Sequence, residues 1–300
     1  MSVLICDNIT KIYKDYNSIR DFSFNFLDNQ IYAIIGRSNS GKETLLQLMT
    51  ANIKPSSGIV YLDGEELTSS SKNRSRLCYI PNDTVFPDYI MIKTILQEMK
   101  KKYPKWDNFY AYFLVKHFGI KPSATFSSLL INKKFLLLNI IALASKANIT
   151  FFDDSISEID IKDRYDFFYF LYSHHQTYPR TIIFATEHVD EIDHLFDKIL
   201  FLDRGKLIDF FTIEEIKNNF CYLSGKAEVL KSLISEVKVI GVEDRGKYLT
   251  VCIHKKLNKD ETRKFQKYLI KISEVPIQKV FIYLIKLKKL KEKKTDQENN

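Results

Sequence analysis

Glycine is scarce in this sequence. The chain has 9 glycines in 300 residues, whereas an average composition would supply about 7%, or roughly 21. Glycine reaches left-handed and closely approached backbone conformations at the least cost, so a chain with few glycines is expected to place them where geometry demands them. Two of the nine, Gly36 and Gly41, fall within six residues. This stretch is therefore the first candidate for a functional loop.

Long apolar runs are also absent. The longest, Phe135–Ala144, is interrupted by Asn139, whereas a membrane-spanning helix needs about 20 apolar residues. The N-terminal stretch has no basic segment followed by an apolar one, so no secretory signal is expected. The cysteines form no Cys-x-x-Cys pair, which argues against a zinc site or a disulfide framework. They are Cys6, Cys78, Cys221 and Cys252. We therefore expect a cytoplasmic protein with reduced thiols.

The charge balance is moderately basic, with 45 Lys and Arg against 37 Asp and Glu and a net charge of +8. Such an excess suits a protein that faces a membrane surface or a polyanion. The basic tail over 286–300 and the aromatic-rich stretch over 103–118 invite a nucleic-acid interpretation. Neither carries an RNA-binding motif, and a solvated face explains the tail, so no nucleic-acid partner is expected.

Short apolar runs alternate with helical stretches along the first two thirds of the chain. Ile31–Ile35, Ile149–Phe152 and Thr181–Ala185 are typical of strands buried on both faces. A helical stretch over 161–175 separates the last two. This alternation predicts an α/β fold with a largely parallel sheet. From about residue 220 the pattern changes to that of a small α+β extension.

The glycine pair belongs to a phosphate-binding pattern. Residues 36–42 read Gly-Arg-Ser-Asn-Ser-Gly-Lys, which fits G-x-x-x-x-G-K between a buried strand and a helix. In such a loop the backbone N–H groups and the helix N-terminus surround phosphate oxygens, and the lysine adds a point charge. The next residue is Glu43 where a Ser or Thr that holds Mg²⁺ is expected, and Thr44 follows. The candidate nucleotide-binding residues are Gly36, Asn39, Ser40, Gly41, Lys42, Glu43 and Thr44.

With the loop placed, the sequence resembles the ATP-binding subunits of ABC transporters, and more narrowly the ATPases of bacterial ABC-2-type exporters. The segments SSGIVYLDGEEL (56–67) and DKILFLDRGKLI (197–208) are similar to strand-and-turn segments of that family. Asp153 follows an apolar strand at the family's second Mg²⁺-holding position, and Asp160 ends a segment that resembles its D-loop. The resemblance covers about residues 1–215.

The resemblance implies an ABC-type P-loop ATPase domain, with a mixed sheet and a helical subdomain, followed by a small C-terminal α+β extension. It places the ATP-binding domain over 1–218, with the helical subdomain at about 83–146. An accessory domain over 219–286 and a charged tail over 287–300 follow. The implied cofactors are ATP and Mg²⁺.

The resemblance also implies roles for individual residues. Tyr13 is similar to the aromatic residue that stacks on adenine in this family. Asp153 and Glu43 are candidate Mg²⁺ ligands. Asn82 stands at the position of the Q-loop glutamine, which joins the nucleotide site to the membrane partner, and is a further candidate ligand.

Several positions depart from the family pattern. Asp154 replaces the general-base glutamate and is one methylene shorter, and a misplacement of about 1 Å can cost about 10²-fold in rate. The position of the switch histidine falls on Glu187, with His188 next to it. The signature loop falls on 129–133, which contains no glycine. These changes predict nucleotide binding with impaired hydrolysis, while the alternative is that Glu43, Asp154, Asn82 and His188 act as shifted equivalents.

The expected function is that of a nucleotide-binding subunit of an ABC-type exporter. The partners implied are membrane-spanning subunits and a second ATPase subunit, in a homodimer or a heterodimer. The location implied is cytoplasmic and peripheral, on the inner face of the cell membrane. A non-catalytic pseudo-ATPase, which scaffolds or regulates a transporter without using ATP, is the alternative.

Overall fold

A computed structural model describes residues 3–14, 16–70, 72–153, 158–187, 189, 192–235 and 237–298, with side chains described up to residue 290. The chain forms two compact units, one of residues 1–188 with 195–207 and the other of residues 189–194 with 208–300. Each is considered by itself.

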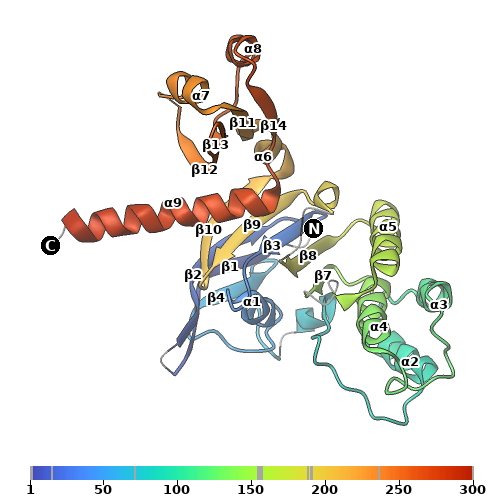
Figure 1. Cartoon of the computed structure of the whole chain (residues 1–300). Helices are drawn as coiled ribbons and strands as arrows, with labels where there is room; N and C mark the ends of the chain where they lie inside the picture. The colour runs from blue at the N-terminus through green and yellow to red at the C-terminus, as the bar shows by residue number, and fades with distance from the viewer. Residues whose placement is uncertain are drawn as a thin grey trace. The chain divides into compact units, whose positions relative to one another are not determined.

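Two sheets lie in the first unit, except that most of β10 (Lys206–Thr212), the edge strand of the larger sheet, belongs to the second unit (Figure 1). This larger sheet has six strands, in the order β10, β9 (Lys198–Asp203), β3 (Ile31–Ile35), β8 (Thr181–Thr186), β7 (Ile149–Phe152) and β6 (Leu77–Tyr79). The pairs that β3 forms with β8 and β9, and β7 with β8 and β6, are parallel. The other sheet is antiparallel, in the order β2 (Tyr16–Phe26), β1 (Leu4–Tyr13), β4 (Ser57–Leu62) and β5 (Glu65–Glu66). The α/β fold with a mixed sheet that the sequence predicts is thus confirmed.

The apolar runs that indicate buried strands lie at the centre of the parallel sheet. Every residue of β3, β7 and β8 is buried, because strands covered on both faces need apolar side chains on both. Helix α1 (Lys42–Met49) follows β3 after the loop at 36–41 and buries its apolar side against the same core. The core therefore anchors the loop at both of its ends.

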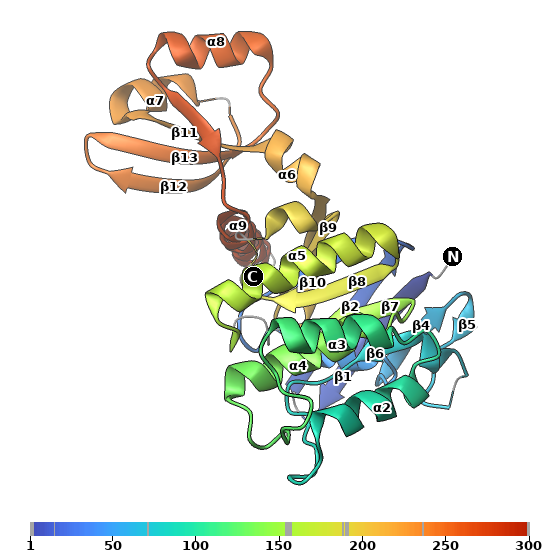
Figure 2. The same ribbon diagram turned by 90° about the vertical axis from the view of Figure 1, so that its right-hand side faces the viewer.

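The described part of this unit has four further α-helices: α2 (Ile92–Lys102), α3 (Asn108–His117), α4 (Ile131–Ala144) and α5 (Ile161–Thr177). Helices α2, α3 and α4 lie side by side (Figures 1 and 2). Nine consecutive residues of α4, Leu136–Ala144, are buried, as expected of a helix that is apolar all round. A short 3₁₀ helix, Lys72–Arg76, precedes β6.

The second unit contains a β-α-β-β-α-β module, in which α7 follows the first strand and α8 precedes the last. Its elements are β11 (Phe220–Lys226), α7 (Ala227–Leu233), β12 (Val239–Arg245), β13 (Tyr248–His254), α8 (Lys259–Lys267) and β14 (Lys271–Glu274). The antiparallel strand order is β12-β13-β11-β14, which is that of a ferredoxin-like fold. Helices α7 and α8 share an apolar core with one face of the sheet (Figure 2). The predicted α+β extension is confirmed.

Helix α9 (Ile277–Glu298) begins against the other face of that sheet. The ring of Tyr283 lies over Gly241, where an added Cβ would come within 2.4 Å of the ring. The Tyr283 hydroxyl and Lys279 Nζ each donate a hydrogen bond of 2.9 Å to Glu243 Oε1.

Helix α6 (Ile213–Asn219) begins with a capping box at Thr212. Over the described part of the chain, no helix combines the length and apolarity that crossing a membrane requires.

Candidate functional site

The loop between β3 and α1 has the backbone geometry that its glycines allow. Gly41 has a φ of +102°, and a Cβ there would lie 2.5 Å from the carbonyl oxygen of Ser18. A Cβ on Gly36 would lie 2.7 Å from the carbonyl oxygen of Leu202. Neither position accepts a side chain without moving backbone. The sequence therefore folds into a tight turn that leads directly into the N-terminus of α1.

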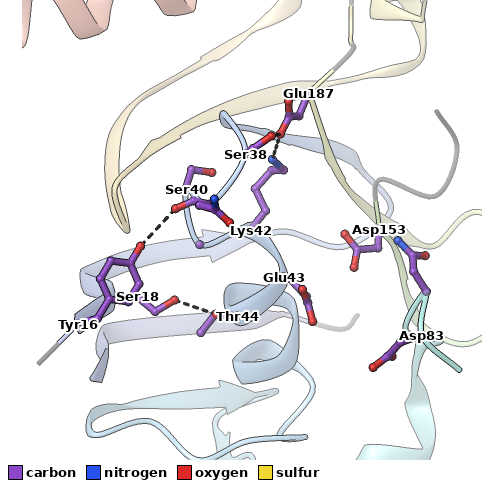
Figure 3. A pocket seen from close by; sticks show the side chains of 13 residues that line it. Tyr16, Ser18, Ser38, Ser40, Lys42, Glu43, Thr44, Asp83, Asp153 and Glu187 are labelled. Atoms are coloured by element: carbon purple, nitrogen blue, oxygen red, sulfur yellow. Dashed lines mark hydrogen bonds and ion pairs between the residues drawn. The ribbon is translucent and has the colours of Figure 1, made fainter. Parts of the chain in front are cut away.

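A cavity of about 770 Å³ opens beside this loop (Figure 3). It is lined by Tyr16, Ser18, Ser38, Asn39, Ser40, Gly41, Lys42, Glu43, Thr44, Asn82, Asp83, Asp153 and Glu187. Lining residues come from the loop and α1, from β2, and from the segments that follow β6, β7 and β8. The carboxyl ends of parallel strands are where open α/β sheets place their ligands.

The cavity brings together most of the residues that the sequence predicts as ligands of nucleotide and Mg²⁺. These are Asn39, Ser40, Gly41, Lys42, Glu43, Thr44, Asn82 and Asp153. Gly36 is not a lining residue and instead shapes the turn. Asp154 and His188 lie outside the described residues.

Tyr13 does not line the cavity; Tyr16 does. The two are cross-strand partners in the β1–β2 hairpin. Tyr16 donates a hydrogen bond of 3.3 Å from its hydroxyl to the carbonyl oxygen of Asn39. Lys11 Nζ lies 5.1 Å from the centre of the Tyr13 ring. Sequence reasoning missed Tyr16, although its place three residues after Tyr13 in the same hairpin was a usable signal.

Three acceptors surround the ammonium group of Lys42. Its Nζ donates to the carbonyl oxygens of Gly36 at 2.7 Å and Arg37 at 3.2 Å, and it pairs with Glu187 Oε1 at 3.1 Å. The Ser38 hydroxyl donates to the same carboxylate oxygen at 2.8 Å. Only 9% of the Lys42 side chain is exposed. Sequence reasoning placed Glu187 at the position of the switch histidine without predicting this ion pair.

Acidic groups dominate the opposite side of the cavity. Figure 3 shows Glu43 pointing toward the side where Asp83 and Asp153 lie. Partial burial, followed by the negative charges of Asp153 and Asp83, raises the pKa of Glu43 above its ordinary value. Tyr79 donates a hydrogen bond of 3.1 Å to Asp153 Oδ2, and its pKa is raised by burial first and by Asp153 next. These carboxylates therefore lie close enough to repel one another.

Glu43 and Thr44 are also bound to neighbouring side chains. Gln47 Nε2 donates to Glu43 Oε1 at 2.9 Å, and the Ser18 hydroxyl donates to Thr44 Oγ1 at 2.8 Å. Among the residues that the structure describes, no three His, Cys, Asp or Glu side chains group as a complete metal site. Mg²⁺ in nucleotide sites is held by one or two carboxylates together with phosphate oxygens, so the oxygen donors present suit a shared Mg²⁺ and do not form a protein cage.

The segment at the position of the signature loop, 129–133, runs through the N-cap Leu130 into the first turn of α4. Leu130 and Ile131 are 72% and 63% exposed there. Asn132 Nδ2 donates to Asp160 Oδ2 at 2.7 Å, which ties this segment to the one that resembles a D-loop.

The fold and the loop together are those of an ATP-binding cassette. Residues 19–157 match the family described as ABC transporter. The resemblance to ATP-binding subunits of ABC transporters that the sequence predicts is thereby confirmed.

Individual relatives agree with this class. The ABC transporter ATP-binding protein YtrB of Bacillus subtilis (strain 168) is 24% identical over 247 residues, covering 82% of this chain and 84% of that protein. Four other relatives are much longer, and the chain spans 4% to 13% of their lengths.

Solved structures of low identity show the same fold. An ATP-binding subunit of an ABC transporter has a TM-score of 0.64 at 17% identity, covering 72% of this chain and 92% of that chain. A dimeric, post-hydrolysis ATP-binding cassette bound to ADP and Pi has a TM-score of 0.61 at 16% identity, covering 70% of this chain and 98% of that chain.

Proposed function

We propose that this chain is the nucleotide-binding subunit of an ABC-type membrane exporter and binds ATP at the loop over 36–42. The observation that carries the proposal is the cavity of about 770 Å³ at the N-terminus of α1, with Lys42 in its wall. Backbone N–H groups at a helix N-terminus, with the partial positive charge of the helix dipole, form an anion-binding site. The likeness to ATP-binding subunits supports ATP as that anion.

In this proposal, residues on one side of the cavity bind the phosphates of ATP and residues on the other side bind Mg²⁺. The loop residues Asn39, Ser40 and Gly41 offer backbone N–H donors, and Lys42 offers its ammonium group. Asp153 and Glu43, on the other side, offer oxygen ligands to Mg²⁺, and Asn82 lines the same cavity. Bound Mg²⁺ would neutralise phosphate charge that these carboxylates otherwise repel. Tyr16 and Tyr13 are the two aromatic candidates for contact with the base.

Weak hydrolysis is part of the proposal. Glu187 stands where the family has its switch histidine, and its carboxylate is bound to Lys42 and Ser38. A carboxylate so placed adds negative charge where charge develops in phosphoryl transfer, which is the reverse of the stabilisation that catalysis requires. Asp154 and His188 remain the candidate catalytic residues on grounds of sequence.

The proposed partners are a second ATPase subunit, identical or different, and membrane-spanning subunits on whose cytoplasmic face the chain would sit. Leu130 and Ile131, exposed at the start of α4, belong to the segment that faces the partner's nucleotide in this family. Large exposed apolar side chains of this kind are common at protein–protein contacts.

The state of Lys42 also favours the second candidate, a pseudo-ATPase that scaffolds or regulates a transporter without using ATP. An ammonium group has three N–H donors, and three acceptors surround this one. In this alternative the internal ion pair is permanent, and nucleotide does not displace it.

Calorimetric titration of the purified chain with ATP, with and without Mg²⁺, tests the proposal. We expect binding that Mg²⁺ strengthens and that Lys42→Ala weakens by about 100-fold, because the loop then loses its charged donor. Lys101→Ala, which removes a lysine 73% exposed on α2, is the matched control and should bind as the wild type does. Absence of binding at millimolar ATP would favour the scaffold instead.

A further inference from the structure

Glu187 is the one side chain that competes for the Lys42 ammonium among the described residues. The other two acceptors are carbonyl oxygens of Gly36 and Arg37, within the loop itself. Those two acceptors are fixed parts of the loop, whereas the Glu187 side chain can turn away from the lysine. An anion that binds the ammonium group therefore competes with the Glu187 carboxylate, whose side chain is 31% exposed and follows the last residue of β8.

The position of this carboxylate corresponds to that of a phosphate oxygen. In loops of this pattern the lysine reaches the β- and γ-phosphates, and here Glu187 Oε1 accepts both from Lys42 Nζ and from the hydroxyl of Ser38. Figure 3 shows the carboxylate above the loop with the lysine extended toward it. The protein thus supplies its own anion at the place where a terminal phosphate would bind.

The remaining charges of the cavity add to this effect. Glu43, Asp83 and Asp153 carry acidic side chains, and Lys42 is the single lysine or arginine among the described residues of the lining. Each additional phosphate brings at least one more negative charge into the cavity. A diphosphate brings only its terminal β-phosphate to Lys42, whereas a triphosphate also brings a γ-phosphate, with its further negative charge, against the Glu187 carboxylate.

We propose that Glu187 is a specificity-determining residue that makes this site select nucleoside diphosphates over nucleoside triphosphates. The inference rests on the proposed nucleotide-binding function and adds to it which phosphate chain the site prefers. It implies that the diphosphate state is the resting state of the subunit. Occupation by a triphosphate then requires the end of β8 to move its carboxylate away from Lys42.

The test compares the Kd of ADP and of ATP by calorimetry for the wild type and Glu187→Gln, at one fixed Mg²⁺ concentration. Glutamine keeps the size of the side chain and removes its charge. We expect Glu187→Gln to tighten ATP binding by about tenfold and ADP binding by less than about threefold, so that the preference for ADP is lost. Ser38→Ala, which removes the second anchor of the carboxylate, should shift the ratio in the same direction by a smaller factor.

Asp203→Asn is the matched charge control. Asp203 is paired with Arg37 of the same loop at 2.6 Å and does not contact Lys42, so its removal changes the local charge equally without freeing the lysine. It should change ADP and ATP binding by similar factors. Thermal unfolding of each variant verifies that it is folded.

The outcomes separate the two proposals. Nucleotide binding with an unchanged ADP-to-ATP ratio in Glu187→Gln, or an equal change in Asp203→Asn, would overturn the role of Glu187 and leave the proposed function standing. Failure of both the wild type and Glu187→Gln to bind either nucleotide would overturn the two together.

Discussion

Replacing Gly205 with alanine should destabilise the protein by about 3 kcal/mol and weaken nucleotide binding at the same time. Gly205 has a φ of +77°, and a Cβ there would lie 2.3 Å from the carbonyl oxygen of Ser18 and 2.8 Å from its carbonyl carbon. The left-handed conformation alone costs an L-residue about 1–2 kcal/mol. Overlap with the backbone of β2 adds to this cost, because neither the turn nor the strand can move without breaking sheet hydrogen bonds.

The same residue couples the fold to the phosphate loop. Gly205 N donates to the carbonyl oxygen of Ser40 at 2.8 Å, and Arg20 N donates to the carbonyl oxygen of Gly205 at 2.8 Å. The turn that contains Gly205 therefore ties the loop to β2. Pushing this turn away from Ser18 should displace Ser40 and with it the N–H donors of the loop.

Urea unfolding of Gly205→Ala measures the stability effect, with Gly64→Ala as the control. Gly64 has a similar φ of +84°, but nothing lies within 4 Å of an added Cβ, so its replacement should cost only the conformational strain of about 1 kcal/mol. Equal losses in the two variants would mean that close approach to Ser18 does not contribute. Calorimetry with ADP on both variants then tests the coupling to the loop.

Local patterns identified the parts of the site that are continuous in sequence. The strand Ile31–Ile35 has the bounds that its apolar run predicts, because a run of five apolar residues before a glycine has few other ways to be buried. The loop after it follows from the spacing of Gly36, Gly41 and Lys42, since that backbone shape needs glycine at two positions. Periodicity and turn chemistry act over a few residues, and these features span no more.

Contacts between distant residues could not be predicted in the same way. Lys42 and Glu187 meet because β3 and β8 are parallel neighbours, with Ile35 opposite Thr186. Composition does not determine which strands pair or in what register, because both are set by packing over the whole sheet. The ferredoxin-like strand order of the second unit could not be predicted for the same reason. Four short strands allow many pairings, and no motif in that part of the sequence distinguishes one pairing from another.

Acid is expected to destabilise the folded protein strongly, because the buried His174 must stay neutral in the fold. This residue of α5 is 5% exposed, and its ring stacks on Tyr110 with 4.3 Å between ring centres. The guanidinium of the buried Arg180 donates to its Nδ1 at 3.1 Å. Because arginine stays protonated, this Nδ1 must be the unprotonated nitrogen. His174 is therefore neutral in the fold, with its proton on Nε2, which is buried without a hydrogen-bond partner.

Burial, and next the charge of Arg180, lowers the pKa of His174 from 6.5 to about 3; Lys146 and His175 lower it further, whereas Asp107 opposes them. Burial also lowers the pKa of His175. Above pH 6.5 the imidazole of His174 is neutral in the folded and unfolded states alike, so its contribution to stability is complete. As the pH falls from 6.5 toward 3, the unfolded chain takes up a proton that the folded chain excludes, and stability is lost.

The free energy of unfolding, measured by urea titration between pH 7.5 and 4.5, should therefore fall more steeply in the wild type than in His174→Gln. The difference in slope should approach about 1.4 kcal/mol per pH unit, the value for one proton bound only by the unfolded state. Thr177→Ala is the control, because Thr177 is exposed on the same helix and has no ionisable side chain; it should keep the wild-type slope. If His174→Gln keeps that slope too, the acid sensitivity arises elsewhere and the buried imidazole is not its cause.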